Sequence, residues 1–205
     1  MKNLWKDRSL VHIGPQLKGY LEKELEVVPS IILQRIRSDE KTSLQKAYRP
    51  DQSVKIGENR FCILDLGKNS TGFVGAEVKC EKQTTLYITF DEILSDADVD
   101  FKRLGCVNSI CYDLEPGVYN LESIEPYTMR YLKLNVLKGA CEASGVYMRE
   151  YVNPETEQAR FSCSDPNLNL IFESARETFK QNATDIFMDC PSRERAGWLC
   201  DSFFT

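Results

Sequence analysis

The sequence predicts a mainly β chain, with an antiparallel β-sandwich of the jelly-roll type followed by one or two α-helices. From residue 61 to about 151, apolar residues alternate with polar ones at a period of two. Turn-forming glycines and prolines interrupt this stretch at short intervals. After about residue 155, apolar residues instead recur every three or four positions, as in an amphipathic helix. We therefore expect a β-sandwich domain over 1–155 and a helical segment over 156–205 of the 205 residues.

Three segments give the clearest strands, because their apolar residues fall on one face. The residues expected to point inward are Val74, Ala76, Val78, Leu86, Ile88, Phe90, Leu132, Leu134 and Val136. The residues between them, among them Tyr87, Thr89, Lys133 and Asn135, are expected on the opposite face of a half-buried sheet. Gly145–Met148 is a short further candidate, and the run 27–36 could form an earlier strand.

Turn residues separate these strands. They are the stretch 67–72, Glu115-Pro116-Gly117, Glu125-Pro126 and Lys138-Gly139. The glycine-rich stretch 65–75 is not a phosphate-binding loop, because Gly72 is followed by Phe73 and a strand pattern where that loop requires Lys and a helix. A corner between two strands is the favoured interpretation.

The best-defined helix begins at Asp165, which can cap it, and at Pro166, which suits the first helical position. Pro191 disfavours helical geometry at Cys190, so the helix is expected to end before the segment 189–191. A second helix is expected to begin near Gly197 or Trp198. The apolar face expected of this amphipathic helix consists of Leu168, Ile171, Phe172, Ala175 and Phe179.

Composition excludes several classes of function. A net charge of −5 offers no broad basic surface for nucleic acid. The single histidine, His12, excludes histidine-rich metal sites and a histidine-based triad, and no cofactor is expected. The eight cysteines form no CxxC pair and are expected mostly as small buried residues of a reducing compartment. The amino terminus lacks the apolar run of a signal peptide and no segment resembles a membrane span, so we expect a cytoplasmic protein.

Two further stretches have competing interpretations. The acidic run 91–100 lacks the glycine and glutamate of an EF-hand loop, so a solvated loop is favoured over weak calcium binding. Four tyrosines could line a sugar-binding groove, although aromatic residues are also ordinary strand formers, and core packing is favoured. They are Tyr112, Tyr119, Tyr127 and Tyr131.

The segment 188–201 concentrates three carboxylates, two arginines and a tryptophan just beyond the first helix. Glycoside hydrolysis requires a protonated carboxylic acid, a second carboxylate to activate water and often an aromatic wall for the sugar. Glu194 has the chemistry of such an acid, but Arg193 and Arg195 flank it and would favour its ionised form if they contacted it. Either these arginines point elsewhere or another carboxylate opposes them. A charged loop with internal salt bridges is the competing interpretation.

The run from Asp189 to Asp201, DCPSRERAGWLCD, closely resembles the active-site signature of the bacterial α-L-rhamnosidases, family 78 of the glycoside hydrolases. Members commonly read DCPQRDERLGWTGD, so this chain is one residue shorter before Glu194 and has Cys200 where glycine is usual. Three upstream segments resemble other family motifs in the same order. These are 65–73 (DLGKNSTGF), 125–131 (EPYTMRY) and 161–169 (FSCSDPNLN).

The resemblance implies a β-sandwich followed by the start of an incomplete (α/α)6 barrel of six helical hairpins. It implies an inverting glycosidase that removes terminal α-L-rhamnosyl residues from glycosides or polysaccharides, with Glu194 as the general acid. Asp189, Arg193, Trp198 and Asp201 would bind the rhamnose, and the two aspartates would tune Glu194.

The general base of the family would be a second glutamate far along the barrel, beyond these 205 residues. The isolated chain is therefore expected to be inactive, and its exposed helical surface is expected to promote association. The alternative is a non-catalytic β-sandwich module that binds carbohydrate or serves a structural role.

Overall fold

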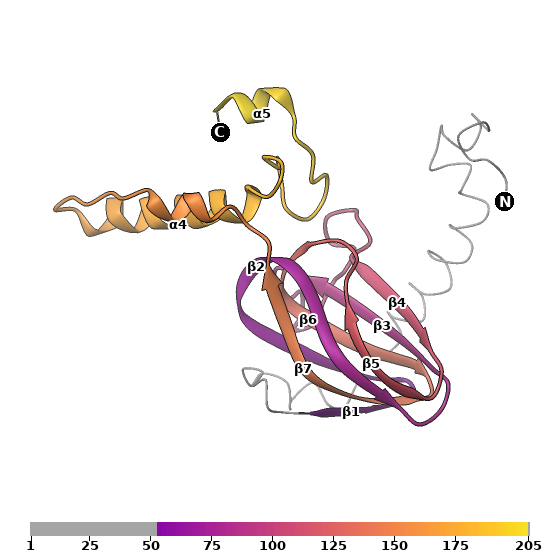
Figure 1. Ribbon diagram of the computed structural model, residues 1–205. Coiled ribbons are helices and arrows are strands. Elements are labelled where there is room, and N and C mark those ends of the chain that lie inside the picture. Colours follow the sequence, from indigo (N-terminus) through magenta and orange to yellow (C-terminus); the bar gives the residue numbers. More distant parts are fainter. Residues whose placement is uncertain (1–52, 205) are drawn as a thin grey trace, which may run out of the picture. The chain divides into compact units, whose positions relative to one another are not determined.

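The computed structural model describes residues 53–204, which form seven antiparallel strands followed by helical elements (Figure 1). His12 and the run 27–36 lie outside the described residues. The strands are β1 (Val54–Gly57), β2 (Arg60–Cys80), β3 (Thr84–Asp91), β4 (Ser109–Leu114), β5 (Gly117–Glu122), β6 (Tyr127–Lys138) and β7 (Ala140–Glu150). The helical elements are the 3₁₀ helix η3 (Pro154–Gln158), α4 (Pro166–Asn182) and α5 (Leu199–Phe204).

The long strand β2 takes part in both layers of the sandwich (Figure 1). Its first half, from Arg60 to Asp65, pairs with β6, which continues to β3 and β4. Its second half, from Gly75 to Cys80, lies between β5 and β7, and β7 pairs with β1. The predicted sandwich followed by helices is therefore confirmed. The change from strands to helical elements falls between Glu150 and Pro154.

The alternation of apolar residues correctly predicted the core. All nine residues expected to point inward from the three clearest strands belong to one buried cluster, which also includes Ile56, Cys62 and Met129. Three of the four tyrosines, Tyr112, Tyr119 and Tyr127, pack against this cluster. The interpretation of these three as packing residues is therefore supported. Burial of this apolar surface, at roughly 25 cal/mol per Å², is the main source of the sandwich's stability.

The predicted corner at 67–72 is instead part of continuous strand β2. Pairing with β6 is interrupted only between Asp65 and Ser70, where the register shifts. Gly67 adopts a φ of 88°, in the left-handed region that glycine tolerates best, and its N–H donates to Asp65 Oδ1 at 2.8 Å. A β-bulge of this kind bends a strand without ending it, which allows β2 to pass between the layers. The other three turns lie between strands as expected.

The outer face of β3 and β6 is buried, contrary to the half-buried sheet that was expected. Asn135 is 0% exposed and Lys133 is 4% exposed. Lys133 Nζ donates to both carboxylate oxygens of Asp98, at 2.8 and 3.0 Å, and lies 3.7 Å from the centroid of the Phe61 ring. The local pattern predicted a solvent-exposed position for Lys133. Its charge is instead buried, and partners from distant segments compensate for the loss of water.

The acidic run 91–100 is mostly the loop that was expected, with Asp96 and Asp100 exposed, but it is fixed to the sandwich at two points. Asp91 is 1% exposed and forms a two-bond ion pair with Arg103, at 2.7 and 2.8 Å, while Asp98 pairs with Lys133. Val99 within the run is also buried. Within residues 53–204, no group of three His, Cys, Asp or Glu side chains is arranged to hold a metal ion. Two aspartates of this run therefore serve as structural anchors.

The cysteines are less buried than expected, since only Cys62, Cys80 and Cys141 have buried side chains. Desolvation raises the pKa of the Cys141 thiol to about 12. Cys111 and Cys200 are exposed. None of the helices in the described part of the chain is long and apolar enough to cross a membrane.

Asp65 links β2 to β6 through a two-bond ion pair with Arg130, at 2.8 and 2.9 Å. Arg130, and to a lesser extent the Gly67 amide, hold the pKa of Asp65 below its usual value. A carboxylate with a depressed pKa stabilises the fold above its unfolded-state pKa, and this contribution is lost as the pH falls through the native value. The pair thus contributes to stability at neutral pH.

We expect Asp65→Asn to lower the free energy of unfolding by about 1–2 kcal/mol at pH 7, with a smaller loss as the pH approaches the native pKa of Asp65. Urea unfolding across this pH range measures the difference. Glu81→Gln, at an exposed position after β2, is the control and should change little. A loss that does not vary with pH would rule out the ion pair as its cause.

Candidate active site around Glu194

Helix α4 ends close to the sandwich, and its termini follow the sequence prediction. Asp165 caps the amino end by accepting from the Asn167 N–H at 2.8 Å, with Pro166 at the first position. The last residue is Asn182, and the Met188 N–H donates to its carbonyl at 2.9 Å. The chain therefore turns back immediately before residues 189–201, which resemble the active-site signature and are called the signature segment below.

A buried polar contact fixes the carboxyl end of α4 to β2. Gln181 is the one buried residue of α4. Its Oε1 accepts from the Thr71 N–H, and its carbonyl accepts from Thr71 Oγ1 at 2.8 Å. Gln181 Nε2 donates to Glu177 Oε1 at 2.8 Å. Because the polar groups involved are buried and paired, separating α4 from β2 would leave them without partners, which is costly.

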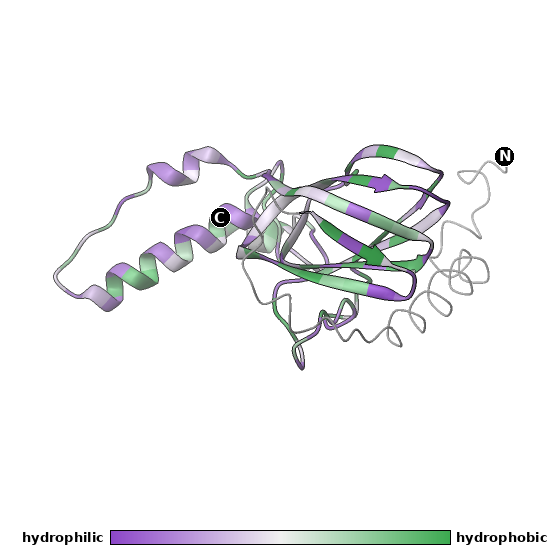
Figure 2. Ribbon diagram, turned by 90° about the horizontal axis from the view of Figure 1, so that it is seen from below, coloured by the Kyte–Doolittle hydropathy of each residue, from purple (hydrophilic) through white to green (hydrophobic). Residues whose placement is uncertain are grey.

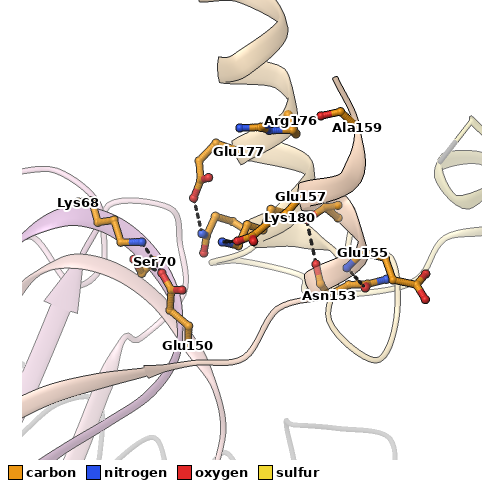
Figure 3. A network of polar contacts seen from close by, with 12 residues as sticks. Lys68, Ser70, Glu150, Asn153, Glu155, Glu157, Ala159, Arg176, Glu177 and Lys180 are labelled. Carbon is orange, nitrogen blue, oxygen red and sulfur yellow. Dashed lines mark hydrogen bonds and ion pairs between the residues drawn. The ribbon is translucent and has the colours of Figure 1, made fainter. Parts of the chain in front are cut away.

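Charged contacts extend this junction to the 3₁₀ helix (Figure 3). Lys180 of α4 pairs with Glu157 of η3 at 2.7 Å, and Arg176 Nη1 donates to the Ala159 carbonyl at 3.1 Å. Asn153 caps η3 by accepting from the Glu155 N–H at 2.9 Å. These contacts join α4 to η3, the short helix that follows the last strand of the sandwich.

The apolar face of α4 is largely exposed. Figure 2 shows hydrophobic positions along the helix, and Leu168, Leu170 and Ile171 are all exposed, while Phe161 packs on Phe172 at a ring distance of 5.3 Å. An amphipathic helix normally buries such a face against another element. The described residues do not cover this face.

The signature segment folds into a loop closed at its base by two hydrogen bonds. The Asp189 N–H donates to the Ala196 carbonyl at 2.9 Å, and the Ala196 N–H donates to Asp189 Oδ1 at 3.0 Å. The Cys190 thiol donates to Asp189 Oδ2 at 3.3 Å. These donors, the Ala196 amide above all, lower the pKa of Asp189. Asp189 is thus an ionised group that closes the loop.

Glu194 lies on the exposed side of this loop, with 38% of its side chain accessible. Its Oε1 accepts from Arg193 Nη2 at 2.6 Å, and its Oε2 accepts from Trp198 Nε1 at 3.0 Å. Its N–H donates to Cys190 Sγ at 3.3 Å. The carboxyl group is therefore oriented by two donors while remaining open to solvent.

The two flanking arginines have different partners. Arg193 contacts Glu194, whereas Arg195 turns to the sandwich, where its guanidinium donates to the Pro126 carbonyl at 2.8 Å and to Glu125 Oε2 at 2.9 Å. It also lies 5.1 Å from the centroid of the Tyr127 ring. Of the two alternatives considered from sequence, reorientation therefore applies to Arg195 and not to Arg193.

The other predicted site residues lie in the same segment. Trp198 is 53% exposed immediately before α5. Asp201 falls within α5, but its side chain lies outside the described part of the chain. A hollow of about 230 Å³ lies beside Glu194 and extends over the loop to the sandwich; its lining includes Met188, Ile186, Glu125 and Thr71. The structure thus brings Glu194, Arg193 and Trp198 into direct contact.

Two contacts of this region were missed by sequence reasoning. Ser192 is buried and its Oγ donates to Glu92 Oε1 at 2.6 Å, across a separation of 100 residues. The Thr71–Gln181 contact spans 110 residues. No local pattern predicts either pair, although Thr71 lies within one of the segments that resemble family motifs.

Three comparisons relate the chain to known proteins. The family model of the bacterial alpha-L-rhamnosidase 6 hairpin glycosidase domain matches residues 156–205. An alpha-L-rhamnosidase of Formosa agariphila is 27% identical over 193 residues, which make up 90% of this chain and 20% of that protein. The chain therefore spans about a fifth of the length of this curated relative.

Solved structures agree with the sequence comparisons. The GH78 family rhamnosidase of Bacillus sp. GL1 superposes with a TM-score of 0.59 at 27% identity, over 73% of this chain and 15% of that one. A rhamnosidase from Klebsiella oxytoca with rhamnose bound shares the fold, with a TM-score of 0.59 at 19% identity, over 71% of this chain and 31% of that one. The resemblance to the α-L-rhamnosidases of glycoside hydrolase family 78, based on four ordered motifs, is thus confirmed by the family model, the curated relative and the solved structure from Bacillus sp. GL1.

Proposed function

We propose that this chain carries the general acid of an inverting α-L-rhamnosidase, and that this acid is Glu194. The observation that supports the proposal is the setting of its carboxyl group, which is exposed and oriented by Trp198 and Arg193. A general acid must reach the glycosidic oxygen from a fixed direction, and two donors on separate oxygens limit its rotation. The substrates would be glycosides or polysaccharides with terminal α-L-rhamnosyl residues.

The neighbouring residues would bind the sugar. Trp198 offers an exposed ring face for stacking, and Asp189 and Asp201 would accept from rhamnose hydroxyls. Arg193 donates to Glu194 Oε1, whereas a general acid must direct one of its oxygens at the glycosidic oxygen. We therefore propose that Arg193 transfers its hydrogen bond to a rhamnose hydroxyl when substrate binds, which frees Glu194 Oε1 to face the glycosidic oxygen.

Inversion requires a second carboxylate that activates a water molecule on the opposite face of the sugar ring. We propose that this base lies in a part of the six-hairpin domain outside residues 156–205, the segment that matches the family model. A polypeptide of these 205 residues would accordingly not hydrolyse rhamnosides. Its exposed α4 face would favour association in solution.

The proposal can be tested with a polypeptide in which this chain continues into a complete six-hairpin domain. Proton NMR of the first product formed from an α-L-rhamnoside should show the β anomer, because a single displacement inverts the anomeric centre. The 205-residue chain should release no nitrophenol from nitrophenyl α-L-rhamnoside under the same conditions. Initial formation of the α anomer, or rapid turnover by the short chain, would refute the proposed mechanism.

A further inference from the structure

The loop that carries Glu194 is held from both sides by glutamates of the β-sandwich. We propose that Glu92 and Glu125 are positioning residues, which fix the general acid by anchoring the residues on either side of it. This inference deepens the proposed function and rests on Glu194 being the acid. It assigns to the sandwich a direct part in the geometry of catalysis.

The two anchors come from different loops of the sandwich. Glu92 follows β3 and accepts from Ser192 Oγ at 2.6 Å, while Glu125 lies between β5 and β6 and accepts from Arg195 Nη2 at 2.9 Å. Ser192 and Arg195 stand two positions before and one position after Glu194. Two contacts at separate points restrain both the position and the rotation of the short segment between them.

Each anchor is itself supported by the sandwich. Glu92 lies 3.9 Å from Arg103 Nη2, and Arg103 is fixed by its two bonds to the buried Asp91. On the other side, Arg195 also donates to the Pro126 carbonyl and lies over Tyr127. The Tyr127 ring packs against the core residue Phe90 at a centroid distance of 4.7 Å. Both lines of contact therefore end in rigid, buried parts of the sandwich.

The loop needs these external contacts because its internal bonds, including that from the Glu194 N–H to Cys190 Sγ, do not fix its position against the sandwich. The paired bonds between Asp189 and Ala196 close the loop but join none of its residues to the sandwich. Arg195 adopts a φ of 50°, a left-handed conformation that is unfavourable for a residue other than glycine. The contacts of its guanidinium with the sandwich offset this cost and select the conformation that points Arg195 away from Glu194.

The first test measures the loop in the 205-residue chain, without reference to catalysis. We expect the double variant Glu92→Ala/Glu125→Ala to increase amide hydrogen exchange at Asp189 and Ala196 about tenfold or more. Folding should survive, because Glu92 and Glu125 retain solvent access and Arg103 keeps its bonds to Asp91. Glu122→Ala removes a comparable glutamate that pairs with Arg149 elsewhere on the sandwich, and it should leave the loop unchanged.

The second test uses the polypeptide with the complete six-hairpin domain and compares two substrates. A displaced acid should lower kcat on an unactivated rhamnoside about 10- to 100-fold, but on the nitrophenyl rhamnoside less than about threefold, because nitrophenolate leaves with little protonation. KM should change little, and Glu122→Ala should behave as the parent enzyme.

Unchanged hydrogen exchange in the loop, or an equal loss on both substrates, would overturn the positioning role. Glu194→Gln, assayed in parallel, separates the two proposals. If Glu194→Gln loses much more kcat on the unactivated rhamnoside than on the nitrophenyl rhamnoside and the double variant does not, the positioning role fails and the function of Glu194 stands. If Glu194→Gln retains full activity, the assignment of the acid fails, and the positioning role fails with it.

Discussion

Glu194→Gln, in a polypeptide with the complete six-hairpin domain, is expected to lower kcat/KM on unactivated rhamnosides about 10²- to 10⁴-fold. The amide has nearly the shape of the carboxyl group but cannot protonate the leaving oxygen. Because the side chain is exposed and its partners Arg193 and Trp198 are also exposed, the substitution should leave the fold unchanged. Steady-state kinetics, together with the melting temperature of both proteins, measure these effects.

The size of the loss should depend on the leaving group. On nitrophenyl α-L-rhamnoside the variant should lose far less activity, because nitrophenolate is stable without a proton. Glu173→Gln is a suitable control: Glu173 lies on α4, is partly exposed and pairs with Arg176, away from the loop. An equal loss on both substrates would assign Glu194 to sugar binding instead of proton transfer.

Much of the fold could be predicted because it depends on local patterns. The alternation in β2, β3 and β6 identified the inward residues, and the cap at Asp165 located the start of α4. The burial of Lys133 and of Asp91 could not be predicted in this way. Each of these charges is buried beside an oppositely charged partner from another segment. The local sequence around such a residue does not differ from that around a solvent-exposed charge.

The same limit applies to the site. Resemblance to family motifs made Glu194 and Trp198 candidate site residues, and the structure brings these two side chains into contact. Sequence could not decide which arginine contacts Glu194, because that choice depends on the backbone conformation of Arg195 and on partners around residue 125. The structure also explains why two of the motif segments occur together: Asp65 of the segment 65–73 pairs with Arg130 of the segment 125–131, where β2 pairs with β6.

Gly72, in the first of these motif segments, lies where three strands meet. It is paired with Tyr127 of β6 and with Glu150 of β7. A Cβ atom here would lie 2.2 Å from the Arg149 carbonyl oxygen and 2.8 Å from the Glu150 Cα. These are backbone atoms, so no side-chain rotation can relieve the overlap. The absence of a side chain at Gly72 is therefore required for β7 to approach β2 beside the Thr71 contact with α4.

We expect Gly72→Ala to destabilise the protein by about 3 kcal/mol or more, since overlap with backbone must separate paired strands. For a chain of this size that corresponds to a fall in melting temperature of roughly 6–12 °C, measured by circular dichroism. Gly75→Ala should cost less, because its close neighbour is the partly exposed ring of Tyr147, which can move aside. Gly57→Ala, with no atom within 4 Å of the new Cβ, should change the melting temperature little. If all three variants have the same melting temperature, the close approach of β7 to β2 is not what requires glycine at position 72.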